Sequence, residues 1–205
     1  MVHIFDHLAV EFPEKAIFLR LGGHCTKTCF DEQTRLHFMQ SSRQAFGCCE
    51  PCGRWSVLQI SPPAADRVET GKGVLLLGED FCRKWNGASH LWYGAVSIGS
   101  ELTCLRDKSE SVSASAVYDA VGSECADAAM DILYSLSRNE LLRKNMVLDE
   151  RRFSPGYGDM PLTLQNFFYN ELKMEQMGVE ITSNSFFVPE KTVTAFAFVH
   201  TLQGN

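Results

Sequence analysis

Residues 151–162 bring together two arginines, two glycines, two prolines, a tyrosine and an aspartate. Arg152 offers a planar fork of N–H donors, which can hold a carboxylate or a phosphate at two points. Gly156 would let a ligand come close to main-chain N–H groups, and Tyr157 adds a ring face with a hydroxyl at its edge. These residue types favour the binding of a small zwitterionic or anionic ligand.

The same segment can also be a simple connector between two helices. Pro155 and Pro161 fix their own φ angles and restrict the residues before them, as turns commonly require. In this interpretation Arg152 forms a surface salt bridge, and Asp159 caps the helix that follows. Because turns are commoner than binding loops, residue types alone favour the connector.

Length and composition predict one domain over residues 1–205. The chain is 45% hydrophobic, which is enough for one sizeable core, and it is short for two full domains. Its net charge of −6 and its pI near 5.5 argue against a nucleic-acid partner. We find no run of eighteen apolar residues and no secretory signal pattern. We therefore expect a cytoplasmic protein that does not span a membrane.

Five of the eight cysteines cluster in residues 25–52. If the intervening helix folds back, four thiolates could hold zinc or an iron–sulfur cluster. The candidate ligands are Cys25, Cys29, Cys49 and Cys52. However, three residues separate the first pair, and Cys48 doubles the second cluster, so the spacing favours free thiols over a metal site.

Hydrophobic periodicity predicts an α+β domain with a mostly antiparallel, twisted sheet flanked by helices. Glycines and prolines mark the ends of the elements. The predicted helices span about 13–21, 31–47, 79–85, 115–136 and 162–177, and the predicted strands span 55–60, 91–99, 180–187 and 191–199. The strands at 91–99 and 191–199 are apolar on both faces, so we expect them at the centre of the sheet.

Several short motifs follow residue 150 in a fixed order. They are Arg152-x-x-x-Gly156-Tyr157, Asp159-Met-Pro161-Leu162, Gly178-Val-Glu-Ile-Thr182 and Val188-Pro-Glu-Lys-Thr-Val-Thr-Ala195. Together they resemble the activation domain of cobalamin-dependent methionine synthase, especially the short forms in which that domain is its own chain. The resemblance is specific over roughly residues 150–200 and weak around 115–130.

The resemblance implies that the ligand is S-adenosylmethionine. Arg152 would grip its methionyl carboxylate, and Gly156 would leave room for main-chain contact. Tyr157 would pack against the ligand or form a hydrogen bond with it. The family also carries an acidic residue on a helix near the bound nucleoside, and the local pattern suggests Asp127, with Glu124 as the second choice.

The implied reaction is a repair step in methionine biosynthesis. Cobalamin carried by a partner methyltransferase occasionally oxidises to an inactive cob(II) state. An electron from a flavodoxin-like or other donor, and a methyl group from S-adenosylmethionine, restore it by reductive methylation. Because cobalt is the nucleophile, this chain needs no Ser–His or Cys–His pair, and catalysis would rest on positioning. The chain would then be a component of an enzyme.

Two other classes of function stay open. One is a non-catalytic module that senses S-adenosylmethionine or docks a corrinoid protein, and the other is a cysteine-ligated metal protein. Ala197 stands where the family carries an aromatic hydroxyl near the ligand, which favours the non-catalytic module or a weaker site. The Arg152 motif favours the methyltransferase component.

Overall fold

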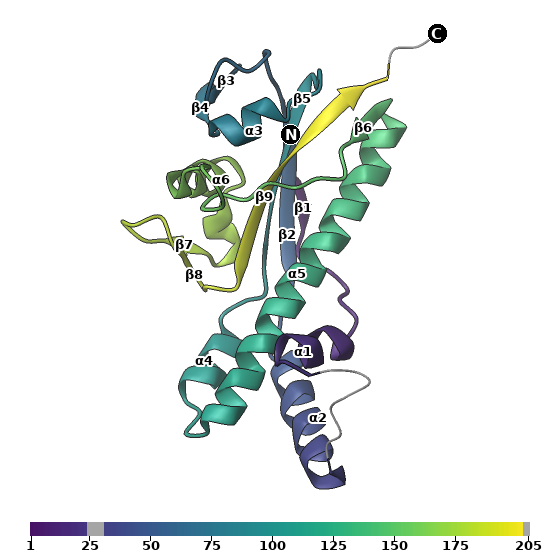
Figure 1. Ribbon diagram of the computed structural model, residues 1–205, viewed down its shortest axis with the longest axis vertical. Helices are drawn as coiled ribbons and strands as arrows, with labels where there is room; N and C mark the ends of the chain where they lie inside the picture. Colours follow the sequence, from purple (N-terminus) through teal and green to yellow (C-terminus); the bar gives the residue numbers. More distant parts are fainter. Residues whose placement is uncertain (24–30, 203–205) are drawn as a thin grey trace.

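The computed structural model describes residues 1–23 and 31–202, and a five-stranded antiparallel sheet forms its centre (Figure 1). The strand order is β1-β2-β5-β9-β6. These strands are β1 (His3–Phe5), β2 (Cys52–Gln59), β5 (His90–Ser97), β9 (Thr192–Thr201) and β6 (Met146–Leu148). The α+β fold with an antiparallel sheet, predicted from periodicity, is confirmed.

Strands β2, β5 and β9 correspond to three predicted strands and differ from the prediction only at their ends. Strand β5 pairs with β2 on one side and with β9 on the other along its whole length. The outer strands β1 and β6 were not predicted, because three residues are too few to show an alternating pattern.

The two faces of the sheet carry side chains of different size. Phe196 and Phe198 of β9 point into one buried cluster, and Ala195, Ala197 and Val199 point into the other. This alternation follows from the period of two along a strand, and it confirms that β9 is covered on both faces.

The face with the small residues packs against α5 (Val112–Arg143), which runs along most of the molecule (Figure 1). The helix is longer at both ends than predicted. Ser111 begins it by accepting a hydrogen bond from the Ala114 N–H at 3.3 Å. None of the helices in the described ranges is both long and apolar enough to cross a membrane.

Three shorter helices pack around the N-terminal part of α5 and form a third buried cluster with it. They are α1 (Glu14–Arg20), α2 (Glu32–Phe46) and α4 (Glu101–Asp107). The predicted cap of α2 is confirmed, since the Asp31 side chain accepts from the Thr34 N–H at 2.8 Å. Helix α4 was not predicted.

The face with the large aromatic residues is covered by shorter elements, which lie on the opposite side of the sheet from α5 in Figure 1. They are α3 (Glu79–Arg83), the hairpin of β3 (Arg67–Thr70) and β4 (Gly73–Leu76), and α6 (Gln165–Glu171). The hairpin was not predicted, because its strands are only four residues long.

The predicted helix over 162–177 is wrong as a continuous element. It consists of a 3-10 turn (Leu162–Leu164), α6 and a second 3-10 turn (Met174–Met177). Between the last two, Lys173 takes a left-handed φ of 51°. Buried Arg54 explains the break: its Nη1 group donates to the carbonyl oxygens of Leu172 and Lys173 at 3.1 and 3.0 Å.

The predicted strand over 180–187 is also wrong as one element. It folds into a short hairpin of β7 (Glu180–Ile181) and β8 (Phe187–Val188). Ser185 has a positive φ and its N–H donates to the Thr182 carbonyl at 2.9 Å, which closes the turn between the two strands.

Candidate functional site

The segment 151–162 lies against the outer edge of β9, where Phe153 fixes it. The N–H of Phe153 donates to the Phe196 carbonyl at 2.9 Å, and the N–H of Phe196 donates back to the Phe153 carbonyl at 2.7 Å. The Phe153 ring also packs edge-on against Phe81 of α3, with the ring centres 4.8 Å apart. The motif gave Phe153 no role, yet this residue anchors the position of its neighbour Arg152.

The turn that follows is held by its own main chain. Gly156 has a φ of 88°, and its N–H donates to the Met160 carbonyl at 3.0 Å. An added Cβ at Gly156 would lie 3.1 Å from the Leu162 side chain, so glycine allows a close approach here. Tyr157 stands at the tip of the turn with 78% of its surface exposed. Its ring is free to cover a molecule bound beside the loop.

A pocket of about 400 Å³ separates this loop from α3. One wall consists of Asp80 and Phe81 of α3 and Lys84, which follows it, and the other consists of residues 152–154 and 157–160 of the loop; Gly156 does not line the pocket. Asp159 joins the two, because its Oδ2 atom accepts a hydrogen bond from the Asp80 N–H at 3.0 Å. The prediction that Asp159 caps the helix after the loop is wrong, since it caps α3 instead.

Arg152 is held between a carboxylate and a ring. Its Nη2 group donates to Asp131 Oδ1 at 2.6 Å, and its guanidinium carbon lies 5.2 Å from the centre of the Tyr134 ring. The Tyr134 hydroxyl donates to the Asp149 carbonyl, and burial raises the pKa of that hydroxyl, which stays protonated. About a third of the Arg152 side chain (32%) is exposed. Arg152 is therefore oriented in advance and still open to a ligand.

Arg152 also borders a second hollow of about 350 Å³ on the side of α5. Its other lining residues are Asp131, Tyr134, Ser135, Arg138 and Glu150. Arg152 thus lines both hollows.

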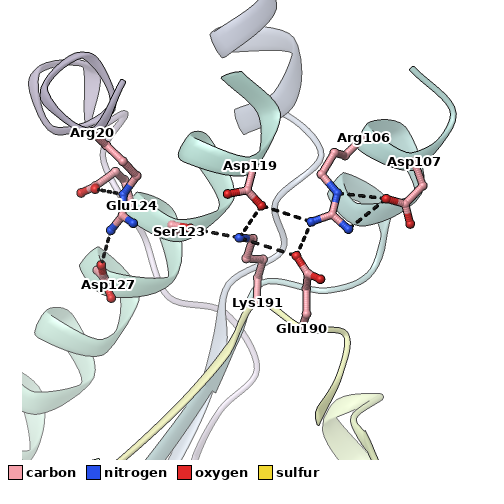
Figure 2. Close-up of polar contacts among 9 residues, drawn as sticks. All are labelled: Arg20, Arg106, Asp107, Asp119, Ser123, Glu124, Asp127, Glu190 and Lys191. Carbon is pink, nitrogen blue, oxygen red and sulfur yellow. Dashed lines mark hydrogen bonds and ion pairs between the residues drawn. The ribbon is translucent and has the colours of Figure 1, made fainter. Parts of the chain in front are cut away.

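Asp127 lies one helical turn before Asp131, on the same face of α5. Its Oδ2 atom accepts from Arg20 Nη2 of α1 at 3.1 Å, and Arg20 also donates to Glu124 (Figure 2). Burial raises the pKa of Asp127, while the Arg20 and Arg152 guanidiniums act to lower it. Asp127 therefore lies within electrostatic reach of Arg152, but the carboxylate that contacts Arg152 is Asp131.

Asp131 was not found from the sequence, although its spacing of four residues from Asp127 places both on one helix face. The α3 wall was not found either. Lys84, at the end of α3, lies over the Phe153 ring at 5.3 Å and lines the pocket. No sequence pattern around Lys84 predicts that it lies beside a loop some seventy residues later in the chain.

The structure describes two of the four candidate metal ligands, Cys49 and Cys52. Cys25 and Cys29 lie outside the described residues. Cys49 and Cys52 are half-buried free thiols, and Cys49 packs against the cluster of α5 that contains Cys125. Contact with Cys125 and burial raise the pKa of the Cys49 thiol. Within the described ranges, no group of three or more His, Cys, Asp or Glu residues is arranged to hold a metal ion.

A network of ion pairs joins α4, α5 and the start of β9 (Figure 2). Lys191 Nζ lies 2.7 Å from Asp119 Oδ1 and 3.0 Å from Ser123 Oγ. Arg106 Nη1 lies 3.1 Å from the same Asp119 oxygen and also contacts Glu190. Asp119 is thus shared by two cations from different elements.

This network predicts a loss of stability in acid. Burial alone would raise the pKa of Asp119, but Lys191 and Arg106 outweigh it and lower that pKa. A lowered folded-state pKa means that the stabilisation is present above an ordinary aspartate pKa, about 3.9, and is lost as the pH falls through the lower folded value. Since 47% of the Asp119 side chain is exposed, we expect its ion pairs to contribute less than about 1 kcal/mol to the free energy of unfolding.

The measurement compares the unfolding free energies of the wild type and Asp119→Asn in urea. The variant should be less stable at about pH 6, and the difference should shrink below about pH 4 and close once the pH lies below the folded-state pKa of Asp119. Asp107→Asn removes a more exposed partner of the same Arg106 and should give a smaller difference. A difference that stays constant across this range would contradict the electrostatic origin.

Comparison with known proteins finds a structural neighbour and no sequence relative. No protein-family model matches this chain, and no curated protein matches it. The crystal structure of the MetH reactivation domain bound to AdoHcy superposes with a TM-score of 0.65 at 16% sequence identity. The alignment covers 98% of this chain and 82% of that one. At this identity the likeness concerns the fold: the chain has the single-domain fold of that reactivation domain, a curled antiparallel sheet with helices.

Proposed function

We propose that residues 1–205 form one activation domain that binds S-adenosylmethionine and supports reductive methylation of cob(II)alamin. The cobalamin is carried by a partner, a methionine synthase or a related corrinoid methyltransferase of the cytoplasm. The observation that carries this proposal is the placement of Arg152. Its guanidinium is oriented by Asp131 and Tyr134 at a pocket of about 400 Å³, in the fold whose solved neighbour was crystallised with AdoHcy.

The donor set suits the amino-acid end of the ligand. Arg152 would bind the methionyl carboxylate with charge-assisted hydrogen bonds from the N–H donors that Asp131 does not use. Asp131, with Asp127 one turn away, would face the ammonium and sulfonium charges of the ligand. Gly156 would shape the loop, and Tyr157 would close over the bound molecule.

The chemical step needs little from this chain beyond positioning. A flavodoxin-like or other donor supplies one electron that reduces the cobalt of the partner's corrinoid. The reduced cobalt takes the methyl group from the sulfonium, the carbon–sulfur bond breaks, and S-adenosylhomocysteine leaves as the neutral product. The residues of this chain would hold the methyl group towards the partner and keep water from the polar side of the ligand.

Arg152→Ala tests the site directly by calorimetric titration with S-adenosylmethionine. We expect the variant to bind at least about tenfold more weakly than the wild type, because a hydrogen bond between charged groups contributes about 1.5–3 kcal/mol. The matched control is Arg151→Ala, which removes the neighbouring arginine. Arg151 does not line the pocket of Arg152; it lines an adjoining hollow, with Asn86 and Asp149, so its loss should leave the affinity nearly unchanged.

Two results would contradict the proposal. One is a wild type that fails to bind the ligand at millimolar concentration, both alone and with its corrinoid partner. The other is equal weakening by both arginine variants, since this would indicate a general effect of positive charge. If binding is confirmed, recovery of methylcobalamin by the partner, assayed with and without this chain, tests the catalytic role.

A non-catalytic S-adenosylmethionine-binding module is the second candidate. It is favoured by Ala197, which is fully buried on the α5 side of the sheet and offers no hydroxyl to a ligand. Binding of S-adenosylmethionine without any recovery of methylcobalamin would support this candidate. A cysteine-ligated metal protein would instead hold stoichiometric zinc or iron after purification, which metal analysis measures.

A further inference from the structure

Helix α3 receives its N-terminal cap from a residue far away in the sequence. Its own N-cap position is Gly78, which has no side chain to accept a hydrogen bond. The acceptor is the carboxylate of Asp159, whose Oδ2 atom lies 3.0 Å from the Asp80 nitrogen. The N–H groups of Asp80 and Glu79 lower the pKa of Asp159, as expected for a carboxylate at the start of a helix. The cap therefore crosses from the loop to α3.

The backbone at Gly78 is shaped for this contact. Gly78 has a φ of 88° and a ψ of 153°, a conformation that residues with side chains rarely adopt. A Cβ atom added there would lie 2.5 Å from Asp159 Oδ1 and 2.9 Å from the Asp159 carbonyl oxygen. Only glycine leaves room for Asp159 to approach, so the two residues form one structural unit.

This unit determines the separation of the two pocket walls. One wall is α3, which contributes Asp80, Phe81 and Lys84, and the other is the loop. Packing of Phe81 on Phe153 joins the walls beside Arg152. Asp159 joins them again further along the loop. With only five residues, α3 has little stability of its own, so its position depends on tertiary contacts, which include these two and the packing of Phe81 on Phe198.

We infer that Asp159 is a positioning residue for the proposed S-adenosylmethionine site, acting by capping α3 and fixing the distance between the pocket walls. This inference rests on the proposed function. Asp159 need not touch the ligand, because its side-chain oxygen is used by the main chain of α3. Its loss would release the first turn of α3 and let the wall that carries Phe81 and Lys84 move away from Arg152.

The test compares Asp159→Ala with Asp159→Asn. Asparagine keeps a side-chain oxygen and caps helices about as well as aspartate. Asp31→Ala is the matched control, because it removes a carboxylate cap of the same kind from α2, at the opposite end of the molecule (Figure 1). The readouts are the affinity for S-adenosylmethionine by calorimetry, hydrogen exchange of the Asp80 amide, and the melting temperature.

We expect Asp159→Ala to bind S-adenosylmethionine roughly tenfold more weakly and to exchange the Asp80 amide faster. Asp159→Asn should restore both properties, and Asp31→Ala should lower the melting temperature without changing the affinity. Wild-type affinity in Asp159→Ala, together with loss of binding in Arg152→Ala, would overturn this inference and leave the proposed function standing. A wild type that does not bind the ligand at all would overturn both.

Discussion

Phe196→Ala is expected to lower the free energy of unfolding by about 3–5 kcal/mol, the usual cost of removing a fully buried phenylalanine. Phe196 is completely buried in β9, an interior strand of the sheet. Its ring lies 4.4 Å from that of Phe168 on α6 and 5.7 Å from that of Phe167. Truncation would therefore leave a cavity between the sheet and α6, below the anchor of the Arg152 loop.

Urea unfolding monitored by circular dichroism measures this loss. The control is Phe186→Ala, which makes the same chemical change at a side chain that is 59% exposed. It should alter the unfolding free energy by no more than about 0.5 kcal/mol. If the two variants lose similar stability, the packing assigned to Phe196 is incorrect.

Gly78→Ala is expected to lower the free energy of unfolding by about 2–4 kcal/mol, the sum of backbone strain and a steric clash. The strain arises because the positive φ of Gly78 is unfavourable for alanine. The clash arises because the new Cβ would meet both the side chain and the main chain of Asp159, and main-chain atoms cannot rotate away. We also expect weaker ligand binding, since the loop must withdraw from α3.

Gly87→Ala separates these two contributions. Gly87 has nearly the same φ, 87°, but an added Cβ would meet no atom within 4 Å. Gly87→Ala should lower the free energy of unfolding only by the backbone strain, about 1–2 kcal/mol, and should leave the ligand affinity unchanged. Equal losses of stability and affinity in the two variants, measured by urea unfolding and calorimetry, would mean that contact with Asp159 contributes nothing.

The sequence predicts the parts of the fold that depend on local pattern. Strands β5 and β9 are long and apolar, and the cap at Asp31 is a local signal, so these predictions are confirmed. The break after α6 could not be predicted, because the group that ends the helix is Arg54 on β2, which is distant in sequence. The three-residue strands β1 and β6 carry too short a pattern to be recognised.

The candidate site also contains residues that the sequence predicts and residues that only the fold brings together. Arg152 stands out by residue type and motif, and the structure places it at a pocket, although its role stays a prediction. Its partner Asp131 could not be distinguished from the other acidic residues of α5 without knowing which helix turn faces the loop. The role of Asp159 was misassigned because proximity in sequence favours the following helix, whereas the chain brings the carboxylate to α3.

The attachment of residues 146–153 to β9 also bears on self-association. An outer strand with unpaired N–H and C=O groups invites another chain to add to the sheet. Here β6 pairs with the last residues of β9, the Asp149 N–H donates to the Phe198 carbonyl, and Phe153 pairs with Phe196. The segment that carries Arg152 thus occupies a sheet edge that could otherwise seed aggregation. Variants that loosen this segment should therefore lose solubility as well as ligand affinity.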